Sequence, residues 1–125
     1  MKTKWRKPAS FLLSFKHALK GIGYSIYSQR NLAVHLIMGM AACGLGLFFK
    51  IEPVEWMLLF LAVTCVLITE LINTAIEILV DLVTRRRRFR AMLSKDIAAG
   101  AVLIASINAA VVGYFIFIKR IMGLF

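Results

Sequence analysis

The stretch Trp56–Val83 reads W-M-L-L-F-L-A-V-T-C-V-L-I-T-E-L-I-N-T-A-I-E-I-L-V-D-L-V, and its first 14 residues carry no charge. Its second half places Glu70, Asn73, Glu77 and Asp81 at steps of three, four and four residues. On a helix these side chains form one polar stripe with apolar residues around it. Carboxylates at membrane depth are costly, and they usually mark a functional site. Three of the six acidic residues of the chain lie on this stripe.

The composition indicates a small integral membrane protein. The chain has 125 residues, 61 % of them hydrophobic, with a mean hydropathy of +0.83. Ordinary soluble domains are nearer half apolar. The net charge of +10 is also typical of nucleic-acid binding, but here the positive residues flank apolar runs instead of interleaving with exposed aromatic residues. We therefore expect no nucleic-acid partner and one membrane unit over residues 1–125.

The apolar runs predict an all-α membrane protein. Leu32–Phe49 and Ile97–Ile118 contain no acidic residue, lysine or arginine, and a span needs ~20 apolar residues. The middle stretch qualifies if its polar stripe faces protein. We expect spans at about 31–50, 54–83 and 96–118. Before them, residues 9–28 repeat apolar side chains every three or four positions, which predicts an amphipathic helix on the membrane surface.

Lysine and arginine residues predict the orientation of the chain. Seven precede the first span and six lie between spans two and three, whereas the other loop and the C-terminal tail together carry three. Cytoplasmic loops are enriched in these residues. We expect a multi-pass protein of the cell membrane with its N-terminus in the cytoplasm and its C-terminus outside. We expect no signal-peptide cleavage, because Lys16, His17 and Lys20 interrupt the apolar segment after the basic start and no small-residue cleavage pattern appears.

The stripe connects the membrane to the cytoplasm. At ~1.5 Å per residue from Trp56 near the outer interface, Glu70 lies roughly 21 Å deep and Glu77 roughly 31 Å deep, against a hydrocarbon core of ~30 Å. Phosphoryl transfer from a nucleotide to a lipid hydroxyl needs a base, a carboxylate-held magnesium ion and cations for the phosphates. Glu70 is the candidate base, Glu77 a metal ligand, and Arg86–Arg88 with Lys95 candidate phosphate ligands. The chain has neither the G-x-x-x-x-G-K-[ST] loop nor the protein-kinase signatures.

The run E-L-I-N-T-A-I-E-I-L-V-D from Glu70, followed by K-D-I-A-A-G-A-V-L-I from Lys95, resembles the signature of the prokaryotic integral-membrane diacylglycerol kinase and undecaprenol kinase family. The patterns F-K-x-A-x-x-G from Phe15 and R-N-x-x-x-H from Arg30 also resemble that family. The resemblance implies a homotrimer of three-span subunits with an N-terminal surface helix. It also implies that magnesium ATP phosphorylates a lipid alcohol at sites shared between neighbouring subunits.

The same resemblance implies roles for individual residues. Glu70 is the catalytic base that acts on the substrate hydroxyl, and Glu77 binds the metal that accompanies the nucleotide. Relatives commonly have a second metal-binding glutamate where this chain has Gln29, which keeps an oxygen ligand but loses a charge. The predicted nucleotide-binding set is His17, Gln29, Asn73, Glu77, Arg86, Arg87, Arg88, Lys95 and Asp96, and the predicted metal ligands are Glu77 and Gln29.

Several alternatives stay open from the residues alone. The acidic stripe can be a structural polar seam between helices, and the run Arg85–Arg90 can anchor the chain to lipid headgroups. Lys95 and Asp96 can simply cap the third span, and His35 can be a polar group satisfied by its surroundings. The substrate is diacylglycerol, giving phosphatidic acid, or undecaprenol, giving undecaprenyl phosphate. The alternative function is a catalytically silent membrane oligomer or accessory subunit; a cation channel is disfavoured by the arginines.

Overall fold

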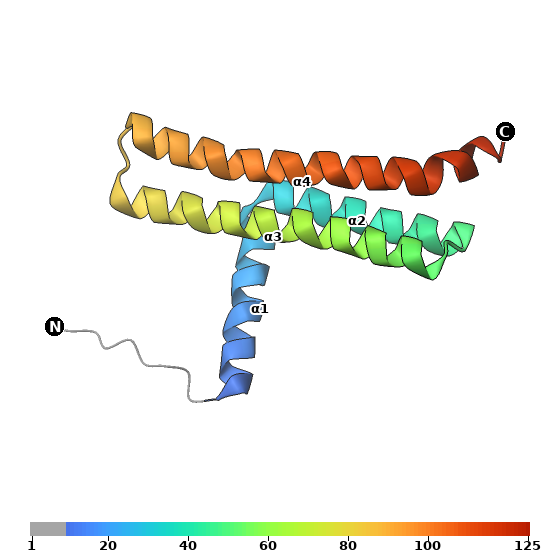
Figure 1. Ribbon diagram of the computed structural model, residues 1–125. Coiled ribbons are helices and arrows are strands. Elements are labelled where there is room, and N and C mark those ends of the chain that lie inside the picture. The colour runs from blue at the N-terminus through green and yellow to red at the C-terminus, as the bar shows by residue number, and fades with distance from the viewer. Residues whose placement is uncertain (1–9) are drawn as a thin grey trace.

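A computed structural model of the chain describes residues 10–125, which form four helices and no strand. They are α1 (Phe11–Ser28), α2 (Arg30–Phe49), α3 (Pro53–Val83) and α4 (Phe89–Met122). Figure 1 shows α2, α3 and α4 running along one another, while α1 leaves this bundle at a steep angle. The last three helices are each long and apolar enough to cross a membrane. The predicted all-α membrane fold with an N-terminal helix and three spans is confirmed.

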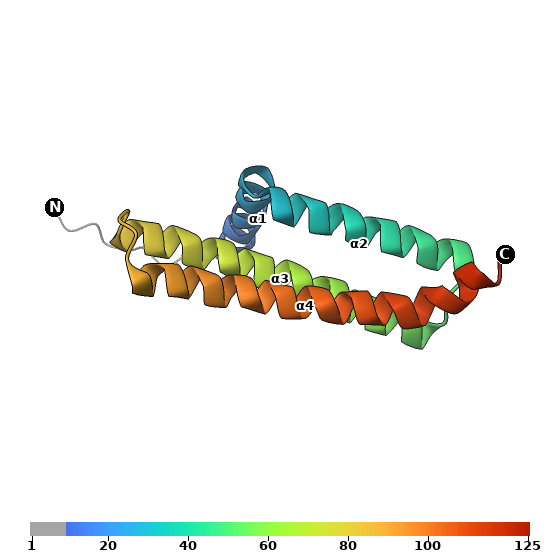
Figure 2. The ribbon, with the colours of Figure 1, turned by 90° about the horizontal axis from the view of Figure 1, so that it is seen from above.

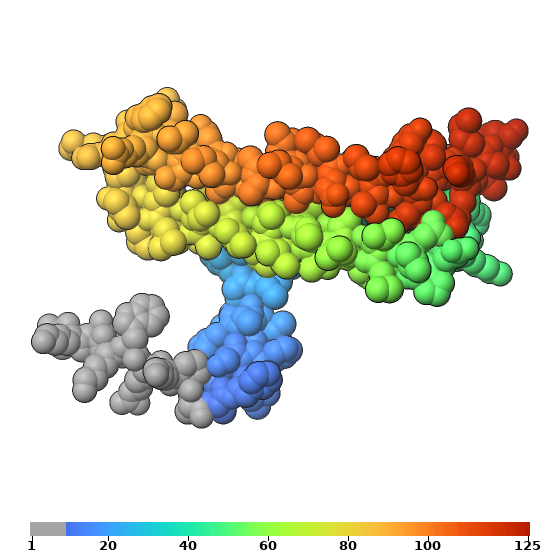
Figure 3. Space-filling model, in the orientation of Figure 1, coloured from blue at the N-terminus to red at the C-terminus, as the bar shows by residue number. Residues whose placement is uncertain are grey.

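The bend between α1 and α2 is made by one residue. Gln29 has φ −116° and ψ 111°, an extended conformation, and it serves as both the C-cap of α1 and the N-cap of α2. A single extended residue between two helices changes the direction of the chain abruptly. Figure 3 shows the consequence, because α1 stands out from the bundle and meets it only at its C-terminal end.

The turn between α2 and α3 is built from standard helix signals. Lys50 adopts the left-handed conformation with φ 52° and ends α2. Glu52 and Glu55 then form a reciprocal capping box, and Pro53 occupies the first turn of α3. Proline is preorganised for this position, because its φ is fixed near the helical value and the missing N–H has no helical partner there. The predicted boundary between the first two spans therefore has a local cause.

Two glycines let α2 approach α3 closely. A Cβ atom on Gly39 would lie 2.8 Å from Val63 Cγ1, and one on Gly46 would lie 2.8 Å from Trp56 Cη2. Near the α2–α3 turn, a small apolar core joins that turn to α3 and α4. Its buried residues are Ile51, Leu59, Ile116 and Phe117. Small residues at helix contacts are typical of membrane bundles, where packing drives association.

The last helix extends further toward the arginine loop than the predicted span. α4 begins at Phe89 with Arg88 as its N-cap, whereas the expected span starts at about residue 96. Lys95 and Asp96 therefore lie about two turns inside the helix, and the alternative that they cap it is wrong. As a result, α3 and α4 continue side by side past the α1–α2 bend, as both ribbon views show (Figures 1 and 2).

Candidate lipid kinase site

The deepest residue of the α3 stripe is turned into the protein. Glu70 is 3 % exposed, and the neighbouring Thr74 is 2 % exposed. The Thr74 hydroxyl donates to the Glu70 backbone carbonyl oxygen at 2.9 Å, so it does not bond to the Glu70 carboxylate. Farther along the stripe, Asn73 and Glu77 are half-buried and Asp81 is exposed. The stripe thus runs from a protein-enclosed carboxylate to open surface.

His35 on α2 contacts Glu70, and the sequence did not predict this contact. Its Nε2 atom lies 3.4 Å from Glu70 Oε1, and the His35 side chain is 24 % exposed. Within residues 10–125, no other cationic side chain lies at ion-pair distance from Glu70. The sequence held two signals, because His35 is an isolated polar residue in an apolar run and ends the pattern R-N-x-x-x-H from Arg30. Its register against α3 is a long-range property that a single sequence does not reveal.

Asn73 and Glu77 form a local pair one turn farther along α3. Asn73 Nδ2 donates to Glu77 Oε1 at 3.3 Å. Within the described part of the chain, the Asn73 Oδ1 atom is buried and has no hydrogen-bond partner. Buried polar atoms are almost always satisfied, so this oxygen indicates a missing donor or cation. Carboxylate and amide oxygens are ligands that a hard cation such as magnesium takes, although here the Asn73 amide turns its Nδ2 and not its Oδ1 toward Glu77.

Gln29 and Glu77 lie at the same level of the bundle. His35 faces Glu70. Counted from that contact, Gln29 lies six residues toward the start of α2, which is ~9 Å along the helix axis. Glu77 lies seven residues toward the end of α3, which is ~10 Å. Both steps run in the same direction along the bundle. Gln29 is half-buried at the α1–α2 bend. The two side chains form no hydrogen bond with each other within residues 10–125.

Cationic residues gather where α3 and α4 meet their connecting loop. Lys95 Nζ lies 2.7 Å from Asp81 Oδ1, which ties the two helices together. The loop arginines are exposed, and a cleft of about 410 Å³ between the helix ends is lined by Arg88 and Arg90 together with apolar residues of α3. Asp96 is exposed on the adjacent part of α4. An anion from the surrounding water can approach this end of the bundle.

An apolar cleft occupies the membrane-spanning part of the bundle. It has a volume of about 380 Å³ between α2, α3 and α4, and its lining is apolar except for His35 and Ser106. Small residues such as Gly39, Ala62 and Gly113 border it. Because Glu70 lies against His35, the apolar cleft and the polar stripe meet at this pair.

Residues 16–117 match the sequence pattern of the prokaryotic diacylglycerol kinase family. The chain belongs to this family. It is 35 % identical to the diacylglycerol kinase of Synechocystis sp. over 124 residues, which cover 98 % of this chain and 71 % of that relative. It is also 35 % identical to the undecaprenol kinase of Bacillus subtilis over 111 residues, which cover 89 % of this chain and 90 % of that relative. The resemblance is confirmed, and the chain is a lipid kinase.

The metal predicted for a lipid kinase of this family fits one part of the site. Glu77 supplies a carboxylate, and the neighbouring Asn73 amide, which faces it through Nδ2 in this structure, would present its unsatisfied oxygen to the same cation after turning over. No cluster of three His, Cys, Asp or Glu side chains forms a cage anywhere in residues 10–125. Magnesium does not need such a cage, because one or two carboxylates and the phosphates of a nucleotide usually hold it. Asn73 is therefore a candidate ligand beside the predicted Glu77 and Gln29.

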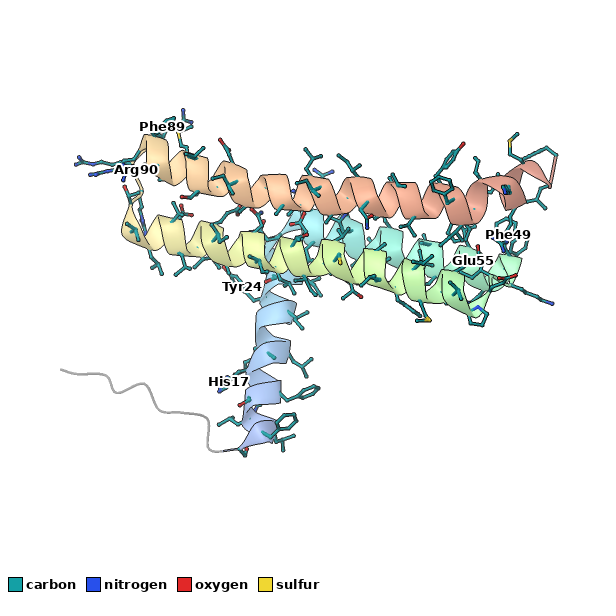
Figure 4. The ribbon with its side chains drawn as sticks, in the orientation of Figure 1. His17, Tyr24, Phe49, Glu55, Phe89 and Arg90 are labelled. Carbon is teal, nitrogen blue, oxygen red and sulfur yellow. The ribbon has the colours of Figure 1, made fainter. Side chains whose placement is uncertain are left out.

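One predicted nucleotide contact stands apart from the others in a single kinase chain. His17 lies on the part of α1 that is remote from the bundle, as Figure 4 shows. It is exposed, like the rest of the first half of α1. The chain does not bring His17 to Asn73 and Glu77, whereas Gln29 at the other end of α1 lies at their level.

Proposed function

We propose that the chain transfers the γ-phosphoryl group of ATP to the hydroxyl of a membrane lipid alcohol, with Glu70 as the general base. The observation that carries this proposal is the buried Glu70 carboxylate, which stands on one helix face with the Asn73–Glu77 pair. A base must lie close to the hydroxyl whose proton it removes. The helix face gives such a base and a phosphate site a fixed separation on one rigid element.

The proposed reaction involves one proton and one phosphoryl group. Glu70 accepts the hydroxyl proton of the lipid, and the freed oxygen lone pair forms a bond to the γ-phosphorus. The bond between that phosphorus and the β–γ bridging oxygen breaks, and its electron pair leaves with ADP. Magnesium, when bound, neutralises phosphate charge. Glu77, Asn73 and Gln29 would hold it, and Lys95, Asp96, the loop arginines and His17 would line the nucleotide site.

The position of His17 supports a shared site. In one chain it is remote from the Asn73–Glu77 pair, so its predicted nucleotide contact requires α1 of a neighbouring subunit. This agrees with the homotrimer that the family resemblance implies. In the proposed arrangement α1 lies on the cytoplasmic membrane surface, the N-terminus is cytoplasmic and the C-terminus is outside.

The alternative function is a catalytically silent oligomer or accessory subunit with the kinase fold. Gln29, in place of the carboxylate common in relatives, and the exposed arginine loop are the features that favour it. The two functions differ in one observable, because a silent subunit does not turn over ATP.

The test is lipid phosphorylation by the purified chain in bilayers. The protein is expressed in a host without its own diacylglycerol kinase, and radiolabelled ATP and magnesium are supplied with diacylglycerol or undecaprenol in parallel. We expect magnesium-dependent transfer of label to at least one lipid, and the ratio of the two rates identifies the substrate. Absence of label in both lipids, with a folded protein, would overturn the kinase proposal and favour the silent subunit.

A further inference from the structure

His35 occupies a position between two parts of the molecule. On one side its Nε2 atom lies 3.4 Å from the buried Glu70 carboxylate, and on the other side the residue lines the apolar α2–α3–α4 cleft. It is the one titratable side chain of that lining. The polar side chains farther along the stripe belong to the Asn73–Glu77 pair, which bonds internally. His35 is therefore the group placed to control the Glu70 carboxylate.

We propose that His35 is a positioning residue for Glu70, a proposal that rests on the function inferred above. In this arrangement a small rotation of the imidazole turns the 3.4 Å contact into a hydrogen bond that Nε2–H donates to Glu70 Oε1. The carboxylate is then held by one oxygen, and its second oxygen, Oε2, stays available to accept the proton of the lipid hydroxyl. After transfer the proton resides on Glu70, and His35 keeps its own proton throughout.

The burial of Glu70 explains why such a partner is needed. A carboxylate that is 3 % exposed has lost most of its contact with water, and a buried ionised group requires hydrogen-bonding partners. The hydroxyl of Thr74, one turn farther along α3, is already bonded to the Glu70 backbone oxygen. Without His35, the carboxylate is free to rotate away from the reacting hydroxyl, and small misplacements of a reacting group lower rates strongly.

The test compares the His35→Ala and His35→Gln variants with the wild-type protein. All three are purified in the same way, in whatever oligomeric state they adopt, and assayed in the same bilayers. His35→Ala removes the donor, whereas glutamine restores an N–H group on a side chain of similar reach. We expect His35→Ala to lower kcat by about tenfold to a hundredfold, with KM for ATP little changed. His35→Gln should recover most of kcat. Cys43→Ala, two turns away on α2 and outside the cleft lining, is the matched control and should keep wild-type kcat.

A second measurement does not depend on activity. The thermal midpoints of wild type, His35→Ala, Glu70→Gln and the double variant form a double-mutant cycle, and a contact between the two side chains makes the shifts non-additive. Wild-type kcat in His35→Ala, or equal losses in His35→Ala and His35→Gln, would overturn the positioning role, and so would additive shifts. If the wild-type chain phosphorylates no lipid, the proposed function fails, and the cycle still decides whether the contact exists.

Discussion

Arg120 near the end of α4 forms a two-pronged ion pair with Glu55 in the first turn of α3, with nitrogen-to-oxygen distances of 2.7 and 2.8 Å. The same carboxylate accepts the backbone N–H of Glu52 in the capping box. The Glu55 side chain therefore caps the first turn of α3 and also binds the end of α4. This contact lies at the opposite end of the bundle from the arginine loop, as the label of Glu55 in Figure 4 shows.

Arg120→Met should lower the thermal midpoint of the purified protein by a few degrees and leave kcat unchanged. The reason is that the pair joins two helices far from Glu70, while both side chains remain partly exposed, so the effect is moderate. Raising the salt concentration should reduce the difference from wild type. Lys119→Met is the control, because Lys119 is exposed and has no ion pair within residues 10–125. A large loss of kcat would contradict this separation of stability from activity.

Gly39→Ala should destabilise the bundle, although alanine favours helices more than glycine by ~1 kcal/mol. The new Cβ would lie 2.8 Å from Val63 Cγ1, and valine is stiff at this bond. Overpacking of this kind costs ~1–3 kcal/mol. Gly44→Ala, where nothing lies within 4 Å, should not destabilise. Thermal unfolding in one detergent compares them, and a stabilised Gly39→Ala variant would refute the close approach of α2 to α3.

Asp81→Asn should lower KM for ATP by about two- to fivefold, because in the proposed site Asp81 competes with the nucleotide for Lys95. The two side chains lie 2.7 Å apart and are partly exposed, and such pairs contribute ~0.2–1 kcal/mol. Lys95→Met should raise KM instead. Glu52→Gln removes a carboxylate at the other end of the bundle and is the matched control. A higher KM in Asp81→Asn would mean that Asp81 holds Lys95 in its binding position.

Gln29→Glu should lower the magnesium concentration that gives half-maximal activity. Gln29 and Glu77 lie at one level of the bundle, so a second carboxylate there adds a charged oxygen ligand for a divalent cation. The measurement is a magnesium titration at constant ATP. An unchanged titration curve would show that the second ligand comes from elsewhere, with Asn73 as the candidate.

The sequence predicted the helices well because their signals are local. The apolar runs, Pro53 after Glu52 and the spacing from Glu70 to Asp81 act within one or two turns, and the helices contain them as expected. The start of α4 was harder to predict from the sequence, because the helical segment from Phe89 to Lys95 lies outside the apolar run. Hydropathy indicates which residues contact lipid and does not indicate where a helix ends.

The candidate site likewise contains one contact that the sequence predicts and one that it does not. The Asn73–Glu77 hydrogen bond joins residues four apart and follows from the stripe. The His35–Glu70 contact depends on the register of α2 against α3. α2 approaches α3 closely at Gly39 and Gly46, and no periodicity in the sequence reports the register between the two helices.

The most direct test of Glu70 as the general base is the turnover of Glu70→Gln. The substitution keeps size and shape but removes the base, and general-base catalysis contributes typically 10²- to 10⁴-fold. In bilayers with radiolabelled ATP and the preferred lipid, we expect a loss of kcat of about this size in a variant that still binds ATP. A Glu70→Gln protein with wild-type kcat would contradict this role.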